Sequence, residues 1–244
     1  MTLNVVIRGL PQHCIMPVTS LQGRSMGGHR FSSRSAGRRS RTCTARRCIM
    51  QIISISGAVA AGKTTLLDRL LRALGPRAQA HEERPQDNPF IRKYYEDPVR
   101  WSFHSQIAFL ALYFDAPLPP DGTCDFYFYD RCLIENLVLA RYRLEQGDLT
   151  PEEYAIIEKV ARGMEGLMPS VDKTVFLRCS VPLLVERLRT RGRDYEGHLG
   201  VEYARKLSAL YEEWLQTLPK DRVLVVDQDA GFALEDVIAF IERG

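Results

Sequence analysis

Short apolar runs alternate with helical patterns along the chain from residue 50 onward. Most of these runs are continuous, without the alternation of polar and apolar positions that marks a strand with one face in water. Continuous apolar strands between helices are typical of a parallel sheet that helices cover on both faces. We therefore expect an α/β domain with strands at residues 50–56, 78–82, 126–130, 172–178 and 222–227. Ligands of such a sheet bind beyond the carboxyl ends of the strands.

Periodic patterns between the strands predict the helices. One helix follows the first strand and ends near Leu74, where a Gly-Pro pair stops it. The pattern over residues 88–114 predicts two helices with a break near Pro98. Another helix begins after Thr150, which combines a capping box with a proline in the first turn. Further helices are expected at residues 131–146, 181–190, 198–217 and 232–242.

Charge separates the first 49 residues from the rest of the chain. The whole chain has 33 Lys and Arg against 30 Asp and Glu, yet residues 1–49 hold nine Arg and no acidic residue. This segment is rich in Ser and Gly and lacks an apolar period, so we expect a disordered basic arm before a domain at residues 50–244. It has three interpretations: a transit peptide, an arm that binds nucleic acid, or translated sequence upstream of the true start. We favour the last, because Met50 directly precedes the first strand.

The remaining composition indicates a cytoplasmic enzyme. The domain is net acidic, which gives no reason to expect a nucleic acid as its partner. No apolar stretch is long enough to cross a membrane, and no apolar core follows the basic residues as it does in a secretory signal. The Cys residues of the domain lack Cys-x-x-Cys spacing, so we expect reduced thiols.

A phosphate-binding loop follows the first strand and opens a helix. The segment GAVAAGKT matches the pattern G-x-x-x-x-G-K-[ST], and it stands in the strand-to-helix context that this motif requires. Backbone N–H groups of such a loop bind phosphate oxygens, Lys63 supplies positive charge to the β- and γ-phosphates, and the Thr64 hydroxyl ligates Mg²⁺. The predicted nucleotide-binding residues here are Gly57, Ala58, Val59, Ala60, Ala61, Gly62, Lys63, Thr64 and Thr65.

A cluster of arginines follows the fourth strand. Arg187 and Arg191 are four residues apart and share a helix face, and Arg193 follows the turn at Gly192. Mobile arginines that close over a γ-phosphate supply the positioning and charge on which phosphoryl transfer depends. The late strands are not followed by the Asn-Lys-x-Asp pattern that reads guanine in GTPases. Together these features favour a kinase over a GTPase switch.

Acidic residues follow two of the predicted strands. Glu82 and Glu83 come after the second strand, and one of them can act as general base for an acceptor hydroxyl. Asp130 ends the third strand, where it can reach Mg²⁺ directly or through water. The next residue, Arg131, can bridge the donor phosphate and the acceptor oxygen.

Four segments carry a resemblance to a known family: GAVAAGKTTLL, EERPQDNPFIRKYYEDPVRWSFHSQIAFL, FYDRCLIEN and VERLRTRGRDYEGHLGVEYARKLSALYEEWL. In this order they resemble the deoxynucleoside kinase family, especially its bacterial deoxyadenosine/deoxyguanosine kinase branch, over nearly all of residues 50–229. The resemblance implies a P-loop kinase with a five-stranded parallel sheet that has helices on both faces. It also implies ATP as phosphate donor, Mg²⁺ as cofactor and a homodimer.

The resemblance implies roles for individual residues. Glu83 matches the family's catalytic base for the 5′-hydroxyl, and Asp130 with Arg131 matches the acid–arginine pair at the metal and the phosphates. The remaining matches are Tyr95 and Glu196 for the 3′-hydroxyl, Gln106 for the base, and Arg187, Arg191 and Arg193 for the lid.

Several positions depart from the family pattern. Ala60 replaces a common Gly of the phosphate loop, which we expect to be a mild change. In the base pocket Tyr113 and Asn136 stand where the family has a paired Arg and Asp. Losing both charges together avoids an unpaired buried charge. Ser105 and Ala140 stand where some members have Phe. These changes predict weak discrimination between bases.

The expected reaction is transfer of the γ-phosphate of ATP, or another nucleoside triphosphate, to the 5′-hydroxyl of a deoxynucleoside. Overall resemblance favours a purine, with Gln106 as the main polar reader of the base. One alternative is a kinase of the same fold that acts on a nucleoside monophosphate or a non-nucleoside alcohol, in which Arg84 and Arg92 could bind the extra phosphate. A second alternative is a nucleotide-binding regulatory protein without turnover, but the intact Lys63 and Glu83 argue against it.

Overall fold

All five predicted strands are present and form one parallel sheet in the computed structural model, which describes residues 50–115, 123–192 and 199–243. The order of the strands across the sheet is β2-β3-β1-β4-β5. Their bounds are β1 Gln51–Gly57, β2 Ala78–His81, β3 Phe126–Asp130, β4 Lys173–Arg178 and β5 Val223–Asp227. The predicted disordered arm, residues 1–49, lies outside the described residues.

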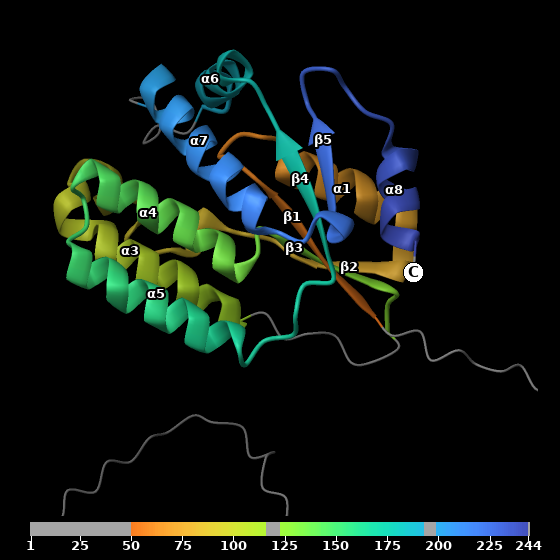
Figure 1. Cartoon of the computed structure of the whole chain (residues 1–244), viewed down its shortest axis with the longest axis horizontal. Helices are drawn as coiled ribbons and strands as arrows, with labels where there is room; N and C mark the ends of the chain where they lie inside the picture. Colours follow the sequence, from red (N-terminus) through yellow and green to blue (C-terminus); the bar gives the residue numbers. More distant parts are fainter. Residues whose placement is uncertain (1–49, 116–122, 193–198, 244) are drawn as a thin grey trace, which may run out of the picture. The chain divides into compact units, whose positions relative to one another are not determined.

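Helices cover both faces of this sheet (Figure 1). The α1 and α8 helices lie on one face, and α4 and α7 lie on the other, with α3 and α5 beside α4. Their bounds are α1 Lys63–Leu74, α2 Ile91–Glu96, α3 Pro98–Leu112, α4 Asn136–Gln146, α5 Pro151–Glu165, α6 Val181–Thr190, α7 Val201–Thr217 and α8 Leu234–Glu242. The predicted α/β fold with a five-stranded parallel sheet is therefore confirmed.

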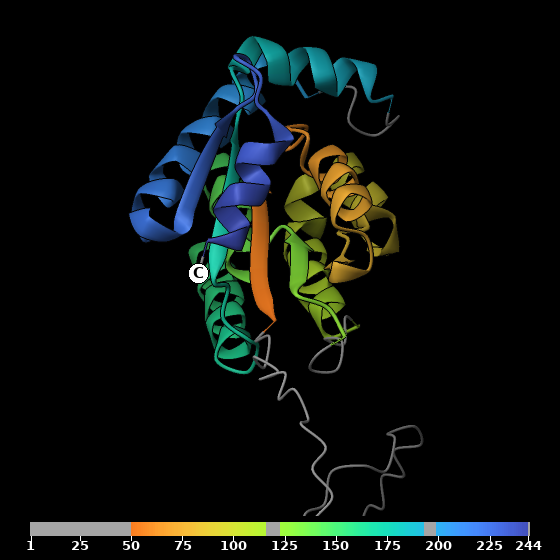
Figure 2. The same ribbon diagram turned by 90° about the vertical axis from the view of Figure 1, so that its right-hand side faces the viewer.

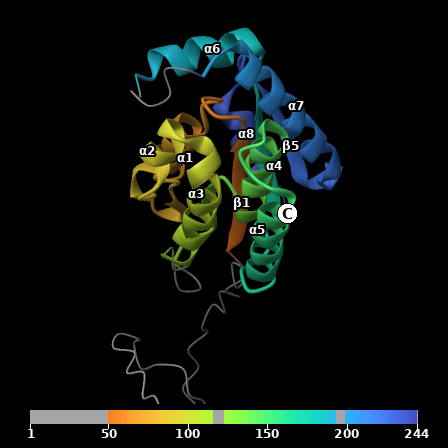
Figure 3. The same cartoon turned by 90° about the vertical axis from the view of Figure 1, so that its left-hand side faces the viewer.

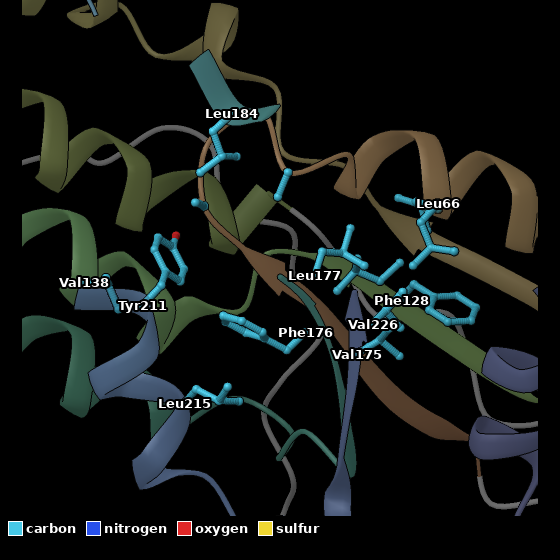
Figure 4. Packing of buried hydrophobic residues seen from close by; sticks show 14 of the residues in the cluster. Leu66, Phe128, Val138, Val175, Phe176, Leu177, Leu184, Tyr211, Leu215 and Val226 are labelled. Carbon is cyan, nitrogen blue, oxygen red and sulfur yellow. The ribbon is translucent and has the colours of Figure 1, made fainter. Parts of the chain in front are cut away.

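Strand side chains alternate between the two faces, as the period of two requires. In β4, Val175 and Leu177 lie on the same side of the sheet as Leu66 of α1, whereas Phe176 lies on the side of α7 (Figure 4). The Phe176 and Tyr211 rings have centroids 6.3 Å apart. Because both sets are buried, the strand reads as an unbroken apolar run in the sequence.

The structure differs from the predicted helices mainly at their starts. The helix expected from residue 131 begins only at Asn136, after a short 3-10 turn, because Arg131 has a φ of +77° that no helix accepts. The helix expected from residue 198 begins at Val201, after Gly200 in an extended conformation. The predicted capping box of α5 is present: Glu153 N–H donates to Thr150 Oγ1 at 3.2 Å, and Thr150 N–H donates to Glu153 Oε2 at 2.9 Å.

The parallel arrangement brings the ends of β1, β2, β3 and β4 to one edge of the sheet. The phosphate loop follows β1, Glu82 and Glu83 follow β2, and Asp130 ends β3. Figure 2 shows α6, which follows β4, crossing over this edge. In the described parts of the chain, no helix has the length and apolar character needed to cross a membrane.

Candidate active site

A cavity of about 670 Å³ opens at this edge of the sheet. Its lining combines cations with aromatic and apolar side chains of the surrounding helices. Its lining includes Ala60, Lys63, Thr64, Glu82, Glu83, Arg84, Tyr94, Tyr95, Ser105, Gln106, Phe109, Asp130, Arg131, Leu139, Arg143, Arg187, Arg191, Tyr203 and Gln228. Most of the predicted site residues thus meet in one place.

Lys63 is folded back onto the phosphate loop. Its Nζ donates to the backbone oxygens of Gly57 at 2.9 Å and Ala58 at 3.0 Å. Burial, with a smaller contribution from the nearby Arg131 charge, lowers the pKa of Lys63 to about 8. The ammonium group is therefore held at the loop with its charge only partly compensated, which favours an incoming phosphate.

The loop backbone takes conformations that the sequence motif alone does not specify. Gly57 has a φ of +139°, and a Cβ there would meet the Leu177 carbonyl oxygen at 2.6 Å, so this position requires glycine. Ala60 has a φ of +66°, in the left-handed region. The replacement of Gly by Ala at this point, expected to be mild, therefore places an L-residue where it is strained.

Ala60→Gly is accordingly expected to raise the free energy of unfolding by about 0.5–1 kcal/mol. Relief of the left-handed strain, roughly 1–2 kcal/mol, outweighs the extra chain entropy of glycine, roughly 0.5–1 kcal/mol. Urea unfolding measures the difference. The matched control is Ala61→Gly, since Ala61 is buried, has no positive φ and should lose stability. An Ala60→Gly protein as destabilised as the control would contradict the strain at Ala60.

Thr64 and Asp130 are the two residues predicted to bind Mg²⁺, and their side chains are in contact. The Thr64 hydroxyl donates to Asp130 Oδ2 at 2.7 Å. Burial raises the pKa of Asp130, and the neighbouring Lys63 opposes this. The other carboxylate oxygen, Oδ1, is buried without a hydrogen-bond partner. A hydroxyl and a carboxylate with a free oxygen are hard ligands of the kind that Mg²⁺ prefers.

Arg131 is the centre of a buried network. It is 2% exposed, and its Nε donates to Glu83 Oε2 at 3.1 Å. Its Nη1 donates to Glu135 Oε1 at 3.1 Å and also contacts the Tyr211 hydroxyl. The left-handed backbone of Arg131 is fixed by its own N–H, which donates to the Ile55 carbonyl. Strain of this kind persists where the surroundings over-determine it, commonly at functional sites.

Glu135 was missed by the sequence analysis. It is fully buried, and the same Oε1 that binds Arg131 also accepts from the Gly57 N–H at 3.2 Å. One carboxylate therefore joins the phosphate loop to the arginine beyond β3. The available signal was its position four residues after Arg131, a spacing that would pair the two side chains in the helix predicted from residue 131. In the structure Arg131 precedes the helix, and the pair forms across the short 3-10 turn. Tyr211 lies on α7, far away in the sequence, and gave no such signal.

The predicted acceptor residues Tyr95 and Gln106 both line the cavity. The rings of Tyr94 and Tyr95 have centroids 4.8 Å apart. Gln106 is buried and its Oε1 has no hydrogen-bond partner, so an acceptor oxygen is available to a ligand. The preceding residue, Ser105, is held by Asn88, whose Nδ2 donates to the Ser105 carbonyl at 3.0 Å.

Tyr113 and Asn136 are buried and are absent from the described lining of the cavity. Asn136 Nδ2 donates to the Tyr113 hydroxyl at 3.1 Å, and that hydroxyl donates to the Arg131 carbonyl at 2.9 Å. These two residues thus support the Arg131 backbone. Direct contact of either with the base, as the sequence predicted, would require a rearrangement of this network.

Of the predicted lid arginines, Arg187 and Arg191 are among the residues that the structure describes, and Arg193 is not. Arg187 Nη1 donates to the Ala61 carbonyl at 2.9 Å and approaches Gln228 Oε1 at 3.4 Å. Arg191 also lines the cavity. Arg193 and Glu196 lie outside the described residues, so their predicted roles stay predictions.

Comparison with known proteins agrees with this geometry. The family model for deoxynucleoside kinases matches residues 53–240. Deoxyadenosine/deoxycytidine kinase of Bacillus subtilis (strain 168) is 29% identical over 167 residues, covering 67% of this chain and 76% of the relative. Deoxyadenosine kinase of Dictyostelium discoideum is 30% identical over 168 residues, covering 69% and 68%.

A solved structure has the same architecture. Deoxyadenosine kinase from M. mycoides with bound dATP matches with a TM-score of 0.67 at 25% identity, covering 78% of this chain and 98% of that one. The family match spans most of the domain and contains the phosphate loop, Glu83, Asp130 and Arg131. The chain therefore belongs to the deoxynucleoside kinase family.

Proposed function

We propose that this deoxynucleoside kinase transfers the γ-phosphate of ATP to the 5′-hydroxyl of a purine deoxynucleoside, with Glu83 as the general base. One observation carries the assignment: the Glu83 carboxylate is held by Arg131 at 3.1 Å, in the same cavity as Lys63 and Asp130. A base, two cations and an acid therefore converge where an acceptor hydroxyl would meet a phosphoryl group. The names of the relatives, which include deoxyadenosine and deoxyguanosine kinases, support the purine.

The chemistry follows from these contacts. Glu83 accepts the proton of the 5′-hydroxyl as its oxygen attacks the γ-phosphorus. Arg131 holds Glu83 with one edge of its guanidinium group and neutralises charge on the transferred phosphoryl group. Lys63, Arg187 and Arg191 add positive charge around the triphosphate. The bond to the β-phosphate oxygen breaks, and ADP leaves.

Mg²⁺ fits the pair formed by Thr64 and Asp130. The buried Asp130 Oδ1 without a partner supplies the free ligand oxygen, and the Thr64 hydroxyl lies beside it. When bound, the ion would neutralise charge on the β- and γ-phosphates. A homodimer and a cytoplasmic location, which the family resemblance and composition predict, belong to the same proposal.

The test is a substrate panel with ATP and the four natural deoxynucleosides, assayed with the wild-type chain and Glu83→Gln. Glu83→Gln should lower kcat by about 10²–10⁴-fold, since a positioned base contributes that much to proton transfer. Glu82→Gln is the matched control, because Glu82, the other candidate base, lines the same cavity but is 42% exposed and pairs with Arg84 at 4.0 Å instead of Arg131. It should keep normal turnover.

Two outcomes would contradict the proposal. Equal losses in the two variants would remove Glu83 from the role of base. A wild-type chain that phosphorylates none of the four deoxynucleosides would move the assignment to a nucleoside monophosphate or a non-nucleoside alcohol as acceptor. The same panel with deoxynucleoside monophosphates would then identify which of the two it is.

A further inference from the structure

Arg143 is a buried cation in the cavity wall that the reaction described above does not use. It lies on α4, is 7% exposed, and lines the cavity one helical turn after Leu139. Its guanidinium carbon stands 3.8 Å above the Tyr94 ring and 5.3 Å from the centre of the Tyr142 ring. Figure 3 shows α2, which carries Tyr94, on the opposite side of the view from α4 and α7.

The described residues leave this guanidinium group incompletely bonded. No salt bridge within 4.0 Å joins Arg143 to any of them, and its Nε is buried without a hydrogen-bond partner. Arg131, by contrast, contacts two carboxylates and a tyrosine hydroxyl. Burial lowers the pKa of Arg143 to about 10, and the nearby Tyr203 and Asp148 only partly oppose this, so the group remains charged at neutral pH.

A buried charge without a partner is costly, and such groups in native proteins require an explanation. The aromatic rings provide part of the stabilisation through cation–π contact. The contact of the guanidinium carbon with the Tyr94 ring at 3.8 Å does not use the N–H donors of Arg143. Those donors form a fork that matches two adjacent acceptor atoms, a geometry that lysine cannot reproduce.

The surroundings of Arg143 suit a flat heterocycle better than a phosphate. Tyr94 contacts the Arg143 guanidinium group, and Leu139 and Tyr203 line the cavity near it. The cations Lys63 and Arg187 instead bond to the backbone of the phosphate loop. The planar fork of arginine pairs with O6 and N7 of guanine, both of which are acceptors. Adenine places the N6 donor beside N7 and would face the fork with a like group.

We propose that Arg143 binds the base of the acceptor and makes the enzyme prefer guanine to adenine. This proposal rests on the proposed function, and it assigns to Arg143 the charged base contact that neither Tyr113 nor Asn136 provides. The preference should stay within the weak discrimination expected from the sequence. One bidentate pair accounts for about 10- to 100-fold between bases.

The experiment compares deoxyguanosine, 7-deaza-deoxyguanosine and deoxyadenosine, by kcat/KM with ATP and by Kd from titration without ATP. The wild-type chain should favour deoxyguanosine over deoxyadenosine by about 10- to 100-fold. Loss of N7 in the 7-deaza compound should weaken binding by about tenfold, as expected for one hydrogen bond to a charged donor. Arg143→Met keeps the apolar stem, and Arg143→Lys keeps the charge without the fork. Both should bring the three ligands to within about threefold of one another.

Arg141→Met is the matched control. Arg141 lies on the same helix, is 50% exposed and pairs with Glu145 and Glu213, so its loss removes the same charge outside the cavity. It should retain the wild-type ratio. The proposal would be overturned if Arg143→Met weakened all three ligands equally, which is the result of a purely structural role, or if it kept the preference. A wild-type chain without turnover on any nucleoside would overturn the proposed function, and the titrations would still decide the role of Arg143.

Discussion

Lys63→Met lowers kcat by about two to three orders of magnitude, the expected loss when one preorganised charge that stabilises the transition state is removed. The Lys63 ammonium group already lies at the phosphate loop, bonded to two backbone oxygens. It therefore needs little reorganisation when the γ-phosphate becomes more negative during transfer. Steady-state kinetics with saturating ATP and deoxynucleoside provide the measurement. Near-normal turnover would contradict the role of Lys63 in phosphoryl transfer.

The fold should survive this substitution. Burial lowers the pKa of Lys63 to about 8. At neutral pH the charged Lys63 side chain is therefore less stable in the folded protein than in the unfolded chain. Removing the charge relieves this cost and offsets the loss of the two hydrogen bonds to the loop carbonyls, so the melting temperature should change little. Lys159→Met, at an exposed position of α5, is the control for loss of a lysine, and it should change neither kcat nor the melting temperature.

Glu135→Leu is expected to lower the free energy of unfolding by about 3–5 kcal/mol, the usual cost of removing one partner from a buried ion pair. The substitution leaves the Arg131 guanidinium group with one carboxylate fewer and the Gly57 N–H without its acceptor. Glu135→Gln keeps an acceptor oxygen and should lose less. Urea unfolding and kcat are measured together, because the same carboxylate holds parts of the site.

The control for this prediction is Glu145→Leu. Glu145 is 42% exposed and pairs with Arg141 at the usual four-residue spacing, so its loss should cost less than about 1 kcal/mol. If Glu135→Leu proved as stable as this control, Glu135 would not be the structural link between the phosphate loop and Arg131.

The site residues that could be predicted are those that belong to a local sequence pattern. The phosphate loop lies between a strand and a helix, and Asp130 and Arg131 stand at the end of an apolar strand, so the fold rule for parallel sheets places them together. The strands were located for the same reason, since burial on both faces leaves an unbroken apolar run.

Residues whose role depends on three-dimensional neighbours were not predictable in this way. Glu135 and Arg143 are charged residues within a helical pattern, and such residues usually face water. Only the packing of α4, which carries Arg143, and of the 3-10 turn before it, which carries Glu135, buries them. Likewise, the left-handed conformation of Ala60 depends on how its loop closes, and the link between Tyr113 and Asn136 joins segments far apart in sequence.

The strand order also affects the order in which the strands can pair while the chain is being synthesised. The central strand β1 pairs with β3 and β4, and not with β2, which follows it along the chain. The Ile52 N–H donates to Asp172 Oδ2 across 120 residues. During synthesis, one edge of β1 therefore stays unpaired until residues 173–178 have emerged from the ribosome. Such a non-local topology slows folding and exposes intermediates to aggregation. Because Gly57 of the phosphate loop pairs with Leu177, the loop reaches its final setting only after β4 has joined the sheet.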